Sequence, residues 1–161
     1  MTKQNVLEVL AYVKNIDKEI EFNNRIMRDL EDQYYYPVGA INMDGMPKAY
    51  GGISRQTETK AMLVPETLSA YMRELEAKNE TLCELKIEVL KEMNSLEYNH
   101  KYILFNFYLG FEKYKNRNKW VQISEQINYS ERQCKNIRDD ALDQLKIKFE
   151  KNIAIANYKI A

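Results

Sequence analysis

Hydrophobic residues in two long stretches of the chain recur every three or four positions, which is the period of an amphipathic α-helix. The stretches cover residues 2–36 and 66–97, and each follows a heptad-like repeat. All three prolines and four of the five glycines lie between positions 37 and 65, so neither stretch contains a strong helix breaker. The pattern predicts an all-α fold that starts with two long helices joined by a loop at 37–65.

Two asparagines interrupt the hydrophobic repeats and indicate how the two helices pair. If the helices fold back on each other across the loop, Asn23 and Asn79 meet in the seam. A buried asparagine pair in such a seam fixes the register of the helices. The alternative is that both side chains lie at a solvated edge. The pattern predicts an antiparallel helical hairpin over residues 1–97, which serves for assembly or for contact with a partner.

The loop at 37–65 is long for a connector, since loops beyond about 12–15 residues are usually functional or disordered. It interleaves Met43, Met46, Tyr50 and Ile53 with glycines. These apolar side chains suggest that the loop docks on a partner, and a partly disordered tip is the alternative.

Residues 98–149 show a different pattern, with shorter apolar segments separated by turns. A dense apolar segment ends at Gly110, and a connector with four basic residues follows it. Three apolar residues between Trp120 and Ile127 then lie on one helical face. A supporting helix followed by two short helices with a tight turn between them is the plan of a helix-turn-helix. We therefore expect a helix-turn-helix domain over this range and a C-terminal tail at 150–161.

The sequence NYSERQ at 128–133 contains both the turn and the start of the second helix. Ser130 is a favourable N-cap residue, and Gln133 three positions later completes the sequence of a capping box. The helix is then expected to begin at Glu131, with polar and basic side chains in its early turns. In a helix-turn-helix these early turns of the second helix enter the major groove of DNA.

Nine polar or basic residues are candidates for contact with DNA. Arg132 and Gln133 are placed to reach base edges, since arginine suits guanine and glutamine suits adenine. The basic connector would follow the phosphate backbone and add affinity that does not depend on sequence. An ordinary solvated helix is the alternative, because Glu131, Asp139 and Asp140 disfavour nearby phosphates. The candidates are Lys115, Arg117, Lys119, Ser130, Arg132, Gln133, Lys135, Asn136 and Arg138.

Charge is distributed unevenly along the chain, although the formal net charge is zero. Residues 1–97 contain 12 basic and 17 acidic residues, whereas residues 98–149 contain 10 basic and 6 acidic residues. Nucleic acid is attracted to regions of positive potential. The distribution indicates that only the C-terminal half meets nucleic acid.

The stretches YILFNFYLGF and KWVQISEQINYSERQCKNIRDDALDQL together resemble the region-four helix-turn-helix of sigma factors, as carried by phage and prophage regulators of the ArpU and RinA kind. The segment GMPKAYGGIS, with the Leu- and Glu-rich helix after it, resembles a group of sigma-like phage proteins. The resemblance covers residues 40 to 146 and implies a role in phage gene expression. It also implies that Arg132, Gln133, Lys135, Asn136 and Arg138 form the DNA face. The basic connector at 112–119 and the Asp139–Asp140 pair depart from the family pattern.

Composition disfavours several other classes of protein. His100 is the only histidine, and together with Cys83 and Cys134 it forms no zinc-ligand spacing and no recognisable catalytic arrangement. Trp120 is interpreted as a core residue. No apolar run approaches the roughly 20 residues of a membrane-spanning helix, and the N-terminus lacks a signal-peptide pattern. We expect a non-enzymatic protein without a metal or cofactor, in the cytoplasm of a bacterial host cell.

The sequence favours a sequence-specific DNA-binding transcriptional regulator of phage or prophage genes that binds double-stranded DNA. A lone helix-turn-helix makes few base contacts, so a homodimer through the N-terminal helices would double the site. Leu10, Phe22 and Ile26, at the margin of the first apolar stripe, are candidates for the dimer interface. The rival interpretation is a non-enzymatic interaction module that binds host RNA polymerase or a phage packaging component.

Overall fold

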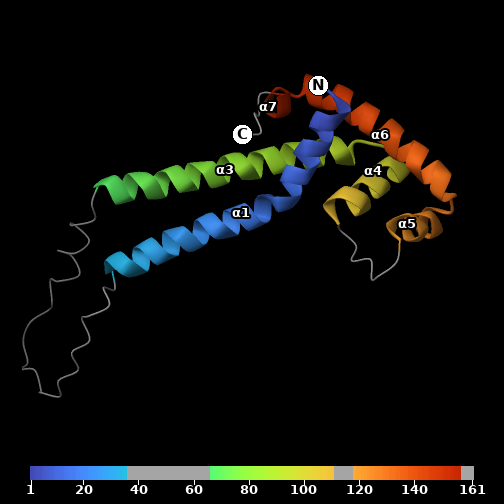
Figure 1. Ribbon diagram of the computed structural model, residues 1–161. Coiled ribbons are helices and arrows are strands. Elements are labelled where there is room, and N and C mark those ends of the chain that lie inside the picture. The colour runs from blue at the N-terminus through green and yellow to red at the C-terminus, as the bar shows by residue number, and fades with distance from the viewer. Residues whose placement is uncertain (36–65, 111–117, 157–161) are drawn as a thin grey trace, which may run out of the picture. The chain divides into compact units, whose positions relative to one another are not determined.

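The chain is all-helical in the computed structural model, which describes residues 1–35, 66–110 and 118–156 (Figure 1). No strand occurs within these ranges, so the predicted all-α class is confirmed. The expectations for the loop at 37–65 lie outside the described residues. The elements are α1 (Lys3–Tyr35), α3 (Glu66–Asn94), α4 (Tyr98–Leu104), the π-helix η1 (Phe105–Leu109), α5 (Lys119–Ile127), α6 (Glu131–Lys151) and α7 (Ile153–Ala156).

Helix α3 ends at Asn94, three residues before its expected end, because the backbone tightens there. The Ser95 hydroxyl donates to the carbonyl of Glu92 at 2.7 Å, and the Leu96 N–H donates to the carbonyl of Met93 at 3.2 Å. Such short-range bonds satisfy the last carbonyls of a helix and terminate it. No described helix combines the length and the apolar character needed to cross a bilayer.

The chain divides into two compact units that cut across the long helices. Residues 1–17 and 81–161 form the first unit, and residues 18–80 form the second. This division does not coincide with the boundary expected at residue 97. The start of α1 and the end of α3 bury apolar side chains within the same unit as the C-terminal helices, so they share a core with them.

The core of the first unit draws side chains from all of its long helices. Leu10 is fully buried here, at 0% exposure, so the expectation that Leu10 lies at an open margin was wrong. Burying one such side chain contributes about 1.5–3 kcal/mol. The other buried hydrophobic residues of this unit are Val6, Val9, Val13, Ile16, Leu82, Leu85, Val89, Met93, Leu96, Ile103, Leu104, Ile123, Cys134, Ala141, Leu142, Leu145, Phe149 and Ile155.

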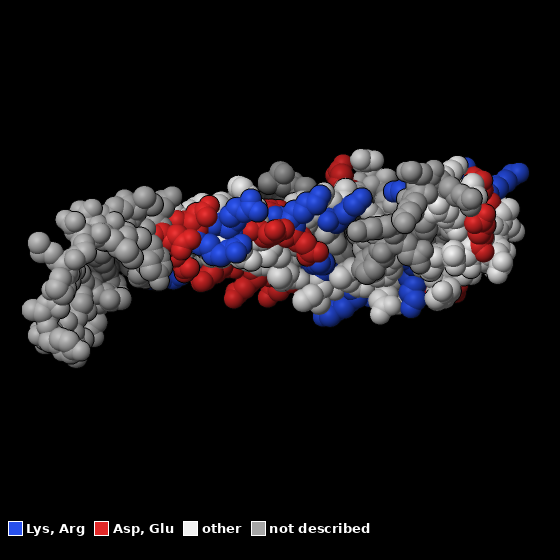
Figure 2. Space-filling view, turned by 90° about the horizontal axis from the view of Figure 1, so that it is seen from below, with Lys and Arg blue, Asp and Glu red and all other residues white. Residues whose placement is uncertain are grey.

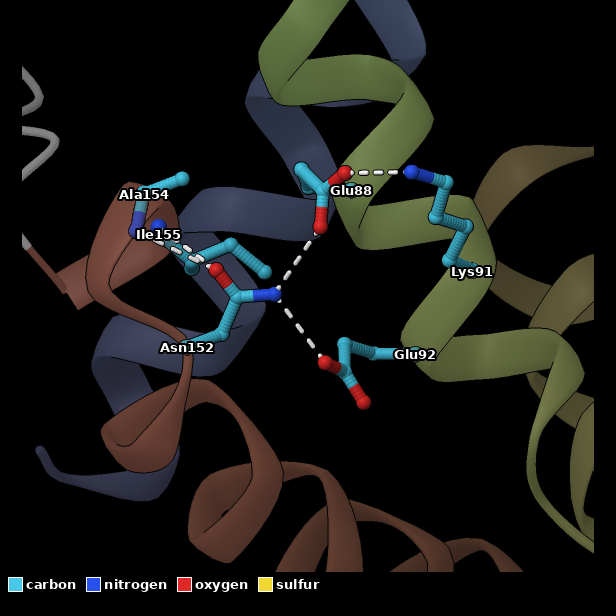
Figure 3. A network of polar contacts seen from close by, with 6 residues as sticks. All are labelled: Glu88, Lys91, Glu92, Asn152, Ala154 and Ile155. Atoms are coloured by element: carbon cyan, nitrogen blue, oxygen red, sulfur yellow. Dashed lines mark hydrogen bonds and ion pairs between the residues drawn. The ribbon is translucent and has the colours of Figure 1, made fainter.

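A polar network around Asn152 ties the end of α6 to α3 within the first unit (Figure 3). The side-chain Nδ2 of Asn152 donates to Glu88 Oε2 at 3.1 Å and to Glu92 Oε1 at 3.0 Å. Its Oδ1 accepts from the backbone N–H groups of Ala154, at 3.1 Å, and Ile155, at 3.4 Å. One side chain therefore caps the start of α7 and fixes its position against α3.

The helical segments of the second unit pair through asparagines. Asn23 Nδ2 donates to Asn79 Oδ1 at 2.7 Å, and Asn79 Nδ2 donates to Asn24 Oδ1 at 3.0 Å. Asn23 is only 4% exposed, so the predicted meeting of Asn23 and Asn79 in the seam is confirmed. An ion pair between Lys78 and Glu19, at 2.8 Å, lies beside it.

Candidate nucleic-acid interface

Helices α5 and α6 are separated by a tight turn that begins at the backbone cap of Asn128 and ends at the N-cap residue Ser130. The side chain of Asn118 accepts a hydrogen bond from the Trp120 N–H at 3.2 Å and starts α5. Asn128 ends α5 in the left-handed conformation, with φ 56° and ψ 41°, which asparagine tolerates better than most residues. Helix α6 begins at Glu131, so only three residues separate the two helices.

The predicted capping box at the start of α6 is confirmed. Ser130 Oγ accepts from the Gln133 N–H at 3.3 Å, and Gln133 Oε1 accepts from the Ser130 N–H at 2.9 Å. The Ser130 hydroxyl also donates to Gln133 Oε1 at 2.9 Å. A bidentate contact with adenine needs both the oxygen and the nitrogen of a glutamine amide. While the cap is intact, Gln133 has only its nitrogen free for that contact.

A small apolar core holds α5 and α6 together. It consists of the buried side chains of Ile103, Ile123 and Cys134, with Phe107, Trp120, Ile127 and Ile137 packed against it. Burial raises the pKa of the Cys134 thiol, which keeps it protonated at neutral pH. Cys134 therefore acts as a packing residue.

Arg132 and Asn136 are the exposed candidates for base contact. They are four residues apart on α6, so they lie on the same face of the helix, one turn apart. Neither side chain forms a hydrogen bond or an ion pair with another described residue. Both side chains are therefore free to reach a ligand.

Lys119, Lys135 and Arg138 lie around a pair of stacked aromatic rings. The ring centroids of Phe107 and Trp120 are 4.5 Å apart, with 29° between the ring planes. Lys135 Nζ lies 5.8 Å and Arg138 Cζ 5.4 Å from the Trp120 centroid, and Lys119 Nζ lies 5.6 Å from the Phe107 centroid. These distances are within the roughly 6 Å range of cation–π attraction. Trp120 thus contributes to the surface as well as to the core.

The later turns of α6 carry carboxylates that are partly neutralised by α1. Lys3 Nζ forms an ion pair with Asp143 Oδ2 at 2.7 Å. That hydrogen bond, with the nearby charges of Asp139 and Asp140, raises the pKa of Lys3. Asp139 also accepts from the Nε and Nη2 groups of Arg138, at 2.8 and 2.6 Å. The first two turns of α6 are therefore mainly basic, and Asp139, Asp140 and Asp143 follow them directly.

Charge on the face seen in Figure 2 is mixed. In the view of Figure 2, Lys and Arg side chains alternate with Asp and Glu side chains and form no broad basic field. The candidate interface consists of the start of α6 and nearby residues of α5. Its basic members with described positions come from α5 and α6, whereas Lys115 and Arg117 lie outside the described residues.

Sequence reasoning missed the roles of Trp120, Phe107 and Lys3. The three-residue spacing of Lys135 and Arg138 places both on one side of α6 but does not indicate which residues lie beside them. Within the described parts of the chain, no group of three or more His, Cys, Asp or Glu side chains is arranged to hold a metal ion. No protein-family model, no curated protein and no solved structure matches this chain.

Proposed function

We propose that this chain is a non-enzymatic transcriptional regulator that binds specific DNA sequences of a phage or prophage. Helices α5 and α6 act as a helix-turn-helix, and α6 enters the major groove with its N-terminal turns. The observation that carries the proposal is the tight, doubly capped turn between α5 and α6, with exposed Arg132 and Asn136 just beyond it. The resemblance to sigma region four supports the same assignment.

In this proposal Arg132 and Asn136 read bases, while Lys119, Lys135 and Arg138 contact phosphates. Arginine pairs with the O6 and N7 atoms of guanine, and asparagine pairs with adenine. Ser130 and Gln133 contribute mainly by holding the start of α6, because they are engaged in the capping box. The backbone amides at this helix start also favour a phosphate.

The long helices α1 and α3 form an antiparallel hairpin that joins two copies of the chain. Phe22 is 61% exposed, and Ile26 one turn further along α1 is only partly buried. A second copy that covers these side chains would bury apolar surface and place two readers on one operator. Leu10 takes no part in this interface, since the chain's own core encloses it.

Binding to labelled DNA fragments that tile the neighbourhood of the coding sequence tests the proposed function. We expect one fragment to bind far more tightly than the rest. Arg132→Ala is expected to cost about 1–3 kcal/mol of that specific binding and to leave weak binding to other fragments unchanged. Arg25→Ala, at an exposed position of α1, is the matched control and is expected to bind like the wild type.

An interaction module is the second candidate function, and the carboxylates of α6 favour it. Asp139, Asp140 and Asp143 follow the basic turns directly and would repel phosphates that approach the middle of the helix. A protein partner with a basic surface would accept them. Binding of purified host RNA polymerase, together with equal and weak binding to every DNA fragment, would favour this second function.

A further inference from the structure

Three cations lie near one aromatic pair in the first unit, and they come from two helices. Lys119 lies in the first turn of α5, and Lys135 and Arg138 lie in the second turn of α6. Phe107 in η1 and Trp120 in α5 form the stacked rings between them. The arrangement therefore depends on the fold and not on a contiguous sequence motif.

The rings restrict where these long side chains go. A lysine or arginine on a helix surface samples many rotamers, whereas the negative face of an aromatic ring attracts its charged end. Two cations near Trp120 and one near Phe107 are thus held close to the same stacked pair of rings. Holding them in advance lowers the entropy lost when they bind an anion.

Gathering like charges is unfavourable unless an anion offsets the repulsion. Among the described residues, Asp139 is the one anion that pairs with any of these three cations, and its partner is Arg138. Neither Lys119 nor Lys135 forms an ion pair with a described residue. The arrangement fits an extended ligand that carries several negative charges, such as the sugar–phosphate backbone of a DNA strand.

We propose that Trp120, supported by Phe107, is a positioning residue that presents Lys119, Lys135 and Arg138 to successive phosphates of DNA. This inference deepens the proposed function and rests on it. In this proposal the cations near the rings provide affinity for any duplex. Arg132 and Asn136 provide sequence specificity. Trp120 acts through the cations and does not itself read a base.

The test measures binding of a mixed-sequence duplex over a range of salt concentrations, so no operator needs to be known. Trp120→Leu keeps an apolar side chain but removes the aromatic face, whereas Trp120→Phe keeps a ring. We expect Trp120→Leu to reduce the slope of log affinity against log salt. The reduction should correspond to the loss of about one to two phosphate contacts, each of which contributes roughly 0.9 to the slope. Trp120→Phe is expected to recover most of the slope, and circular dichroism confirms that both variants fold.

Lys135→Gln supplies the second measurement, made in the wild type and in Trp120→Leu. If Trp120 acts by holding Lys135, the substitution lowers affinity strongly in the wild type and only slightly in the leucine variant. The positioning role is overturned if Trp120→Leu folds and its salt slope is unchanged. It is also overturned if Lys135→Gln lowers affinity equally in the wild type and in Trp120→Leu. If Trp120→Leu does not fold, the test uses Trp120→Phe instead. A salt slope of Trp120→Phe that is as low as the slope of Lys135→Gln then overturns the positioning role, because the remaining ring would not hold Lys135.

The two proposals fail in different ways. Loss of the positioning role leaves the tight binding of one genomic fragment and its dependence on Arg132 intact. If no genomic fragment is preferred but the salt slope still depends on the ring at position 120, the proposed sequence-specific function is wrong. The proposed phosphate contacts then still hold. A wild-type protein that binds no duplex at low salt overturns both.

Discussion

Asn23 donates a hydrogen bond to Asn79 at 2.7 Å while its own side chain is almost completely buried. The two residues are 56 positions apart in sequence, so the bond sets the alignment of one helical segment against the other. A shift by one helical turn would leave a buried amide without its partner. Such an amide costs about 1–3 kcal/mol. The pair therefore selects one register among several that the apolar stripe alone would allow.

Asn79→Ala is expected to lower the free energy of unfolding by about 1–3 kcal/mol, because it leaves the buried amide of Asn23 unsatisfied. Replacing both residues together, as Asn23→Leu with Asn79→Leu, is expected to recover that loss, since no orphaned amide remains. Urea denaturation followed by circular dichroism measures both effects. A double variant that is less stable than Asn79→Ala would contradict the assigned role of the pair.

Acidification offers a test of the network around Asn152. Hydrogen bonds from Lys91 and then from Asn152 hold the pKa of Glu88 below its ordinary value of 4.5. A lowered pKa means that the ionised form stabilises the fold above pH 4.5, and that this contribution is lost as the pH falls through the folded-state pKa. Lys91→Met is expected to raise the pKa of Glu88 and so to shrink the loss of stability on acidification.

An NMR titration of the Glu88 carboxyl carbon in both proteins measures this change directly. Lys91→Met leaves the Asn152 cap of α7 in place, so the helices are expected to persist at neutral pH. Lys14→Met, at an exposed position of α1, is the matched control and is expected to leave the pKa of Glu88 where it is. An unchanged titration in Lys91→Met would show that the ion pair with Glu88 is not maintained in solution.

Features encoded by neighbouring residues could be predicted from the sequence. The capping box of Ser130 and Gln133 depends on a four-residue motif, and the structure contains it. The Asn23–Asn79 contact followed from a regular helical period on both sides of the loop. The capping box needs only neighbouring residues, whereas the Asn23–Asn79 contact also depends on the two helices folding back on each other.

Features that depend on how helices pack could not be predicted in the same way. Periodicity places Leu10 on an apolar stripe but does not show that the core of the first unit encloses it. The Trp120 ring near Lys135 comes from α5, so no spacing in α6 indicates it. Asn106 lies in a π-helix and is only 3% exposed, and its Oδ1 accepts no hydrogen bond from a described residue. The sequence shows a polar residue in an apolar segment but does not show that its side chain is buried.

The ion pair of Lys3 with Asp143 predicts an indirect effect on DNA binding. Lys3→Gln removes the positive charge beside Asp139, Asp140 and Asp143 and leaves the surface of α6 more negative. We expect affinity for a mixed-sequence duplex to fall roughly two- to fivefold at low salt, the scale of an exposed charge interaction. The difference is expected to shrink at high salt, where exposed charges are screened.

Lys14→Gln provides the matched control for this effect, because it removes an equal charge from an exposed position of the same helix. It is expected to change affinity less than Lys3→Gln, since the three aspartates contribute to the electrostatic environment of Lys3. Equal losses in the two variants would mean that total charge, and not the shielding of these aspartates, governs binding. The comparison is made by fluorescence anisotropy of labelled DNA.

The proposed homodimer makes a prediction about mass in solution. In the described part of the second unit, Leu75 is the only hydrophobic residue that is buried, whereas Phe22 is 61% exposed. Two paired helical segments with so little enclosed surface are expected to be marginal alone, because most helical stability in proteins comes from tertiary packing. Light scattering at micromolar concentration is therefore expected to give twice the chain mass of 19.1 kDa.

Phe22→Glu is expected to shift that mass to 19.1 kDa, since a carboxylate at the centre of the interface cannot be buried without a partner. Ile153→Glu is the matched control, because Ile153 is 75% exposed but belongs to the first unit. It is expected to leave the dimer intact. A wild-type mass of 19.1 kDa would refute the dimer, and specificity would then require a second DNA-binding protein such as RNA polymerase, because one short reading helix makes too few base contacts.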